Sequence, residues 1–307
     1  MKIRELAAGL QFPEGPVAMD GGSVVLVEIA RGTVARVAPD GKLSVVATPG
    51  GGPNGAAIGP DGALYVCNNG GFKWHRDPVH GLRPIGQADD YSGGRIERVN
   101  LATGSVERLY DTTGGRGLRG PNDLVFDSTG GFWFTDLGKA RERDMDVGGV
   151  YYARADGSGV IEAAHPFMTA NGTSLSPDEK TLYVCETAGA RLWAYDIASP
   201  GVLSKLPFPS PNGARLVYNG AGYQRYDSMC VDAFGNALVA TLMMGGITVV
   251  SPDGKLVSHV PLPDPYVTNC CFGGPDMRTL YVTLSGVGKL IAIDEWAMPG
   301  LRLAYNA

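Results

Sequence analysis

The sequence predicts an all-β protein, a six-bladed β-propeller built from one domain over residues 1–307. Three observations lead to this prediction. One hairpin pattern recurs six times; glycine, which favours turns over helices, supplies 45 of the 307 residues; and no long stretch shows helical periodicity. A propeller explains all three, because each blade is a small antiparallel sheet joined by tight turns.

The repeated unit is a polar residue, a short apolar run, a turn related to Pro-Asp-Gly, and a β-rich run such as Leu-Tyr-Val. Clear copies occupy residues 54–68 and 171–186, where the turn chemistry and the aromatic or β-branched flanks are typical of hairpins. The six units begin at Glu14, Asn54, Asn122, Asn171, Asp227 and Asn269. These starts lie 40 to 68 residues apart, and a four-stranded blade takes roughly 40–50 residues.

Each unit supplies the first two strands of a blade, and further strand candidates follow it along the chain. They are residues 32–37 with 42–46, then 94–99, 149–152, 191–195 and 246–250. The last run, residues 288–293, has no later partner. We expect the N-terminal strand near residues 2–10 to pair with it and close the ring, because closure removes exposed strand edges.

The longest interval contains an insertion at about residues 70–93, which carries Phe72, Trp74, His75, Arg76 and Tyr91. We expect it to form a loop across one face of the propeller, since long loops in compact domains are often functional. The alternative is that its aromatic side chains only pack the loop onto the blades.

Composition excludes several classes of partner. The formal net charge of −5 provides no basic surface for nucleic acid or an anionic membrane. The longest apolar runs are far shorter than the roughly 20 residues that span a bilayer, and the N-terminus lacks an apolar signal segment. The five cysteines are odd in number and contain no C-x-x-C pair, so we expect no disulfide framework and a cytoplasmic location. The oligomeric state is not predicted.

The first residues of the six units form the candidate functional site. First strands line the channel of a propeller, so equivalent positions meet as a ring at one depth. This ring consists of Glu14, Asn54, Asn122, Asn171, Asp227 and Asn269. Oxygen ligands from carboxylates and amides suit hard divalent cations, and Ca²⁺ is the leading candidate, with Mg²⁺, Mn²⁺, Zn²⁺ or Fe²⁺ as alternatives. The competing explanation is that Asn and Asp simply suit strand starts and turns.

Four motifs at the same phase of the repeat resemble the senescence marker protein/gluconolactonase/luciferin-regenerating enzyme-like family. They are Phe12-Pro13-Glu14-Gly15-Pro16, Gly120-Pro121-Asn122-Asp123, Ala170-Asn171-Gly172 and Asp227-Ser228-Met229-Cys230-Val231-Asp232. The resemblance spans nearly the whole chain and implies a six-bladed propeller hydrolase that depends on a divalent metal, in most members a lactonase. It implies Glu14, Asn122, Asn171 and Asp227 as metal ligands, and Asp227 as the residue closest to catalysis.

One position departs from this pattern. Sugar-lactone members can carry an arginine two residues before the ligand asparagine, but this chain has Gly120 there, with Arg119 and Arg116 nearby. We therefore expect other residues to bind substrate: Asn54, Asn269, Trp74, His75 and Arg119. A second ring, 14 or 15 residues after the first, is expected to support the metal site or to be solvated at a wide rim; its members are Glu28, Asn68, Asp136, Glu186, Thr241 and Leu284.

The sequence thus predicts a metal-dependent hydrolase, first of all a lactonase that opens a sugar or other small lactone to the hydroxy acid. The cation would polarise the ester carbonyl, and Asp227 would activate or orient water. Two alternatives remain open: a phosphotriesterase, and a non-catalytic propeller that a metal only stabilises. A glycine motif at residues 115–120 lacks the strand and helix of a dinucleotide site, and nucleophile-elbow and catalytic zinc motifs are absent.

Overall fold

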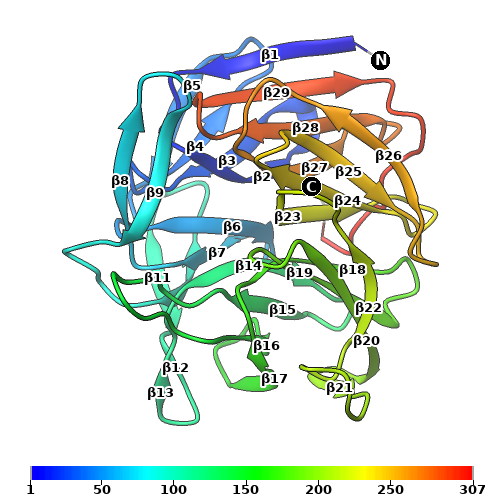
Figure 1. Cartoon of the computed structure of the whole chain (residues 1–307). Coiled ribbons are helices and arrows are strands. Elements are labelled where there is room, and N and C mark those ends of the chain that lie inside the picture. The colour runs from blue at the N-terminus through cyan, green and yellow to red at the C-terminus, as the bar shows by residue number, and fades with distance from the viewer. Residues whose placement is uncertain (1, 306–307) are drawn as a thin grey trace.

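The computed structural model describes residues 2–305 and has six antiparallel sheets around a central channel, which confirms the predicted six-bladed propeller (Figure 1). Blade 1 contains β2 (Pro13–Ala18), β3 (Val24–Glu28), β4 (Thr33–Val37) and β5 (Leu43–Ala47). Blade 2 contains β6 (Pro53–Ile58), β7 (Leu64–Asn68), β10 (Arg95–Val99) and β11 (Val106–Tyr110). Blade 3 contains β14 (Pro121–Phe126), β15 (Gly131–Asp136), β16 (Gly148–Arg154) and β17 (Val160–Phe167).

The other three blades complete the ring. Blade 4 contains β18 (Ala170–Leu175), β19 (Thr181–Glu186), β20 (Arg191–Ser199) and β21 (Val202–Ser204), with β22 (Arg215–Asn219) also paired to β20. Blade 5 contains β23 (Arg225–Val231), β24 (Ala237–Leu242), β25 (Gly246–Val250) and β26 (Leu256–Pro261). Blade 6 contains β27 (Val267–Gly273), β28 (Thr279–Leu284), β29 (Lys289–Asp294) and β1 (Lys2–Ala8). Within residues 2–305 the single helical element is the 3-10 turn η1 (Asp20–Gly22).

The N-terminal strand closes the propeller as the sequence predicts. Strand β1 pairs with β29 from Lys2 opposite Asp294 to Ala8 opposite Lys289, and Arg4 donates to the Asp294 carboxylate across the same pair. The first and last strands of the described residues therefore share one blade, so the ring cannot open without breaking a sheet.

Hydrophobic cores fill the spaces between neighbouring blades. On β15, Phe132 and Phe134 pack with Tyr65 between blades 2 and 3, whereas Trp133 packs with Trp193 between blades 3 and 4. Successive strand residues point to opposite faces, so an uninterrupted aromatic run is suited to a strand buried on both sides. The five cysteines are free, and no helix of residues 2–305 is long and apolar enough to cross a membrane.

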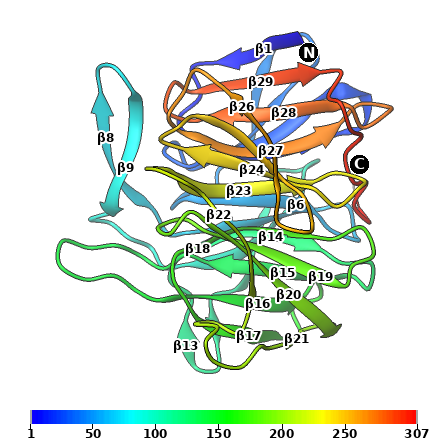
Figure 2. The same ribbon diagram turned by 45° about the vertical axis from the view of Figure 1, so that its right-hand side comes forward.

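The insertion hairpin and the C-terminal segment lie at opposite ends of the channel. The insertion forms a hairpin of β8 (Phe72–Asp77) and β9 (Gly81–Gln87), and a small pair, β12 (Thr112–Thr113) and β13 (Arg116–Gly117), precedes blade 3. Hairpin β8–β9 leaves the blades where β7 ends, which is also the end where β6 begins, because Pro53 pairs with Asn68. Figure 2 shows this hairpin at the left and the red C-terminal segment at the right, on the opposite face.

Candidate functional site

The six predicted ring residues lie on the six innermost strands, at the end of the channel that carries the hairpin. Every innermost strand has an irregular register at or beside its ring residue. Such bulges re-aim a side chain relative to the regular pleat. Gly15, which follows Glu14, has φ of +49°, and a Cβ there would come within 2.5 Å of the Asn54 carbonyl oxygen. Glycine at this position therefore lets neighbouring inner strands approach closely.

The ring side chains are removed from solvent and partly bonded to one another. Glu14, Asn54, Asn122, Asn171 and Asn269 are each at most 5% exposed, and Asp227 is half-buried. Asn269 Nδ2 donates to Glu14 Oε2 at 2.7 Å, and Asn269 Oδ1 accepts from the Cys270 N–H. Asn171 Nδ2 donates to Thr187 Oγ1 at 2.9 Å. Both polar ends of the Asn269 amide are thus engaged within the protein.

Two buried oxygens in this ring have no hydrogen-bond partner, namely Oδ1 of Asn122 and Oδ1 of Asn171. A buried polar atom without a partner costs about 1–3 kcal/mol, so two such atoms beside two carboxylates fit the donor set of a hard cation. No group of three or more His, Cys, Asp or Glu side chains within residues 2–305 is arranged to hold a metal. The ring combines the carboxylates of Glu14 and Asp227 with the unpartnered amide oxygens of Asn122 and Asn171. This set of oxygen donors fits a divalent cation.

The electrostatics of the ring also favour a cation. Burial raises the pKa of the Glu14 carboxyl. Burial, and then the nearby Glu14 charge, raise the pKa of Asp227 well above its ordinary value, while the Asn171 amide acts in the opposite direction. Ionised carboxylates are therefore costly here unless a positive charge lies between them.

Asp123 is a functional candidate to which the sequence reasoning gave no role. It is 6% exposed, and burial together with the Glu14 charge raises its pKa to about 7. Its Oδ1 would lie 2.5 Å from a Cβ added at Gly55 of the neighbouring inner strand. The residue after the ring position is glycine in blades 1, 2 and 4, Ser228 in blade 5 and Cys270 in blade 6, so Asp123 in blade 3 is the one carboxyl at this position. That departure from the repeat is the signal that could have identified it.

Side chains of the second ring bind the loops that immediately precede the residues of the first ring. Glu28 Oε2 accepts from the N–H of Gln11 at 2.7 Å, and Asp136 accepts from the N–H groups of Arg119 and Gly120, both at 2.7 Å. These loop residues come two or three places before Glu14 and Asn122. The members of this ring are at most 7% exposed, so the expectation of a solvated rim is wrong. Glu28, Asn68 and Asp136 accept from backbone N–H groups, whereas Glu186 accepts from the Arg191 and Trp193 side chains.

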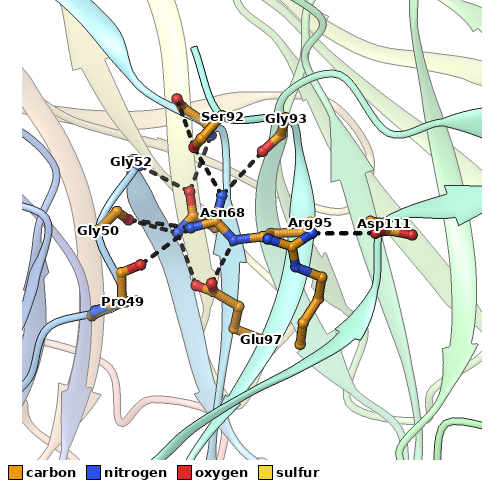
Figure 3. A network of polar contacts seen from close by, with 11 residues as sticks. Pro49, Gly50, Gly52, Asn68, Ser92, Gly93, Arg95, Glu97 and Asp111 are labelled. Carbon is orange, nitrogen blue, oxygen red and sulfur yellow. Dashed lines mark hydrogen bonds and ion pairs between the residues drawn. The ribbon is translucent and has the colours of Figure 1, made fainter. Parts of the chain in front are cut away.

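In blade 2 the loop before the ring residue Asn54 is bound by a buried polar network around Asn68 (Figure 3). Asn68 accepts from the Gly52 N–H at 2.8 Å and donates to the Gly50 carbonyl at 2.9 Å and to Glu97 Oε2 at 2.8 Å. Arg95 pairs with Glu97 and donates to the carbonyl of Pro49. This network fixes the loop before Asn54, because each of its buried polar groups has a partner.

Lys139, another residue that the sequence reasoning missed, fastens the insertion hairpin at its base. The side chain is 1% exposed, and its Nζ donates to Asn69 Oδ1 and the Gly71 carbonyl, both at 2.9 Å. The same Nζ lies 3.9 Å from the centre of the Phe72 ring, a cation–π contact. Burial lowers the pKa of this amine to about 7. No sequence signal marks a single lysine in a loop of another blade as a partner of the hairpin.

The hairpin lies over blade 1 and reaches blade 6. The Trp74 ring is 5.1 Å from the Phe12 ring, Leu82 packs with Phe12, and the Leu82 N–H donates to the Gly286 carbonyl at 2.9 Å. Trp74 is half-buried, whereas His75 is exposed and pairs with Arg83 on the other face of the hairpin. The Arg119 side chain is exposed, with its backbone held by Asp136 and Tyr91. The predicted substrate residues thus share one end of the propeller, but they do not form one contiguous surface.

The opposite end of the channel is covered by the C-terminal segment. A cavity of about 100 Å³ lies beyond the ring, lined by residues from all six inner strands and by Leu301, Leu303 and Tyr305. The Leu301 N–H donates to the Val231 carbonyl at 2.9 Å, and the Tyr305 ring packs 5.8 Å from Phe126. This segment therefore crosses the end of the channel opposite the hairpin.

Comparison with known proteins places the chain among related propellers. The family model described as the SMP-30/Gluconolactonase/LRE-like region matches residues 12–286. A gluconolactonase from Zymomonas mobilis is 28% identical over 310 residues, covering 92% of this chain and 79% of that protein. The lactonase drp35 from Staphylococcus saprophyticus is 31% identical over 257 residues, covering 83% of this chain and 71% of that protein.

Two solved structures share the architecture. A gluconolactonase from Xanthomonas campestris superposes with a TM-score of 0.74 at 24% identity, covering 97% of this chain and 89% of that one. A calcium-binding protein, regucalcin, from Agrobacterium tumefaciens superposes with a TM-score of 0.71 at 19% identity, covering 96% and 95%. At these identities the structural likeness establishes the fold, and the sequence matches establish the kinship.

Proposed function

The chain belongs to the SMP-30/gluconolactonase/LRE-like family, and from this premise we propose that it is a lactonase that requires one divalent cation. The cation would be held by Glu14, Asn122, Asn171 and Asp227. One observation carries the proposal: two buried amide oxygens without partners, those of Asn122 and Asn171, share a ring with two carboxylates. Curated relatives named as a gluconolactonase and a lactonase support the reaction class.

Calcium is the proposed ion, because all four ligands are oxygens and hard cations prefer such a set. The fold neighbour described as a calcium-binding protein supports the same choice. Magnesium, manganese, zinc and iron(II) remain alternatives that metal substitution separates.

When bound, the cation would supply Lewis-acid chemistry at the lactone carbonyl. We assign Asp227 to the attacking water: its carboxylate accepts the proton as the new C–O bond forms. The proton then passes to the ring oxygen as the ester C–O bond breaks, which yields the hydroxy acid. Asn269 holds Glu14 through its 2.7 Å hydrogen bond.

Substrate choice is assigned to the hairpin end of the channel. Trp74 of β8 and the amide of Asn54 are proposed to contact the lactone, whereas His75, on the outer face of the hairpin, is not. The insertion would act as a wall of the active site, since its root and its tip are both bonded to other blades.

The test uses purified full-length protein stripped of metal. Sugar, aliphatic and aromatic lactones and an organophosphate triester are assayed side by side with each cation, and the cation-induced rise in Tm is measured in parallel. We expect lactone hydrolysis, and we expect Asn122→Ala and Asn171→Ala to weaken cation binding, unlike Asn219→Ala at an exposed position of β22. Hydrolysis of the triester alone, or a cation-induced Tm rise without any hydrolysis, would reject the lactonase.

A further inference from the structure

Tyr91 joins the root of the insertion hairpin to the loop that precedes the ring residue Asn122. Its hydroxyl donates to the Arg119 carbonyl at 2.6 Å and accepts from the Gly94 N–H at 3.1 Å. Tyr91 follows β9 in the insertion of blade 2, whereas Arg119 lies three residues before Asn122 in blade 3. The hydrogen bond to Arg119 therefore crosses from one blade to the next, close to a proposed cation ligand.

The two segments are in contact on both sides of this hydrogen bond. A Cβ added at Gly94 would come within 2.6 Å of Pro121 Cδ, the residue just before Asn122. A Cβ added at Gly70, between β7 and β8, would lie 2.4 Å from the Tyr91 ring. Glycine at both positions permits this close approach. The Tyr91 side chain is thus packed against the hairpin root while its hydroxyl binds the blade 3 loop.

Lys139, from the loop after β15 in blade 3, holds the same root. Its Nζ lies 3.9 Å from the centre of the Phe72 ring and 5.5 Å from the centre of the Tyr91 ring. The two ends of the insertion are also bonded to each other, because the Ser92 N–H donates to the Gly70 carbonyl at 3.0 Å. The start of β8 and the segment after β9 therefore form one unit, which both Lys139 and Tyr91 connect to blade 3.

The loop before Asn122 is bound from two blades. Within blade 3, Asp136 accepts from the N–H groups of Arg119 and Gly120, both at 2.7 Å, and the Gly120 carbonyl accepts from the Leu137 N–H at 2.9 Å. The Arg119 carbonyl accepts instead from Tyr91 of the hairpin root. At the end of this loop, Oδ1 of Asn122 is buried without a partner. One short loop thus connects the proposed cation site with the hairpin.

We propose that Tyr91 is a positioning residue of the cation site, which couples cation binding at Asn122 to the order of the insertion hairpin. The proposal rests on the proposed function, because it takes Asn122 as a cation ligand. Coupling between two sites is reciprocal. The hairpin root, through Tyr91, keeps the Asn122 loop in its binding conformation, and the hairpin is restrained in turn when Asn122 binds the cation. The hairpin is then most ordered in the cation-bound protein.

Calcium titration tests the coupling in the absence of any lactone. Ca²⁺ is titrated into metal-stripped, full-length native protein, Tyr91→Phe and Tyr110→Phe. Tyr110 is the matched control, because its hydroxyl also donates to an arginine carbonyl, that of Arg154 at 2.7 Å, and accepts from a glycine N–H, that of Gly159 at 3.1 Å, but from the outermost strand of blade 2. We expect Kd to rise about three- to tenfold in Tyr91→Phe, the scale of one lost hydrogen bond, and less than about twofold in Tyr110→Phe.

Amide hydrogen exchange across residues 72–87 provides the second readout. In the native protein Ca²⁺ should slow this exchange, and in Tyr91→Phe the slowing should be largely lost. The value of kcat at saturating Ca²⁺ should stay close to native in both variants. A merely structural role of Tyr91 would instead lower Tm and leave both the Ca²⁺ affinity and the Ca²⁺-dependent slowing intact.

The coupling and the lactonase can fail separately. Equal Kd values for Ca²⁺ in Tyr91→Phe and Tyr110→Phe, or hairpin exchange that does not respond to Ca²⁺ in the native protein, would overturn the coupling and leave the lactonase intact. A Kd difference as expected, without hydrolysis of any lactone, would reject the lactonase and support the coupling. Absence of cation binding by the native protein would overturn both.

Discussion

Buried carboxyl groups in the channel should make the metal-free protein less stable as the pH rises. Asp123 has an ordinary pKa of 3.8 and a folded-state pKa of about 7. Between these values the folded protein retains a proton that the unfolded chain releases, so the free energy of unfolding falls as the pH increases. At about 1.4 kcal/mol per pKa unit, full ionisation of Asp123 costs about 4 kcal/mol. The raised pKa values of Glu14 and Asp227 add to the loss in the same direction.

The assay is urea unfolding between pH 4 and 8 with a chelator, for the native protein and for Asp123→Asn. Their difference in unfolding free energy isolates Asp123 from the surface ion pairs, and it should shift by about 4 kcal/mol across this range in favour of the variant. Asp156→Asn, at a fully exposed turn, is the matched control and should show no such shift. A saturating divalent cation should offset much of the loss in the native protein. A difference that stays constant with pH would refute the reasoning.

Three further predictions concern individual side chains. Asp227→Asn should lower kcat by about 10²-fold or more with little change in Tm, as expected for loss of a general base. Glu14→Gln should instead weaken cation affinity more than it lowers kcat at saturating metal. Isothermal titration and steady-state kinetics separate these effects, and a native kcat for Asp227→Asn would show that Asp227 is not the base. Trp74→Ala should change the order of lactones by kcat/KM while cation affinity stays within about twofold, and an unchanged order would refute the role of the hairpin. Lys139→Met should increase amide hydrogen exchange across residues 72–87, unlike Lys73→Met, because Lys73 is exposed; equal exchange in both variants would contradict the anchor.

The sequence was sufficient for the architecture because the repeat encodes it directly. Each unit places one polar residue at the start of an innermost strand, and the unpaired run at residues 288–293 required a partner that only the N-terminal strand could supply; β1 fills that place. Equivalent positions of the six repeats lie at the same depth in the channel, so the ring could be predicted without knowing any side-chain rotamer.

Contacts between blades could not be predicted in the same way. The amine of Lys139 reaches the hairpin root from a loop about 70 positions away in the chain, and such a contact depends on how two irregular loops fold. Asn269 was expected at the substrate, but the structure bonds its amide to Glu14 and Cys270. Asp123 lay within reach of sequence reasoning, since it is the one carboxyl among the residues that follow the six ring positions, but its burial and pKa depend on the close approach of inner strands.

The most direct test of the account is titration of a divalent cation into metal-stripped protein while lactone hydrolysis and cation binding are measured on the same sample. The account predicts no hydrolysis without the cation, recovery in proportion to the binding of one cation per chain, and loss of both in a variant that combines Asn122→Ala with Asn171→Ala. Full hydrolysis by the stripped protein, or undiminished cation binding in the double variant, would contradict it.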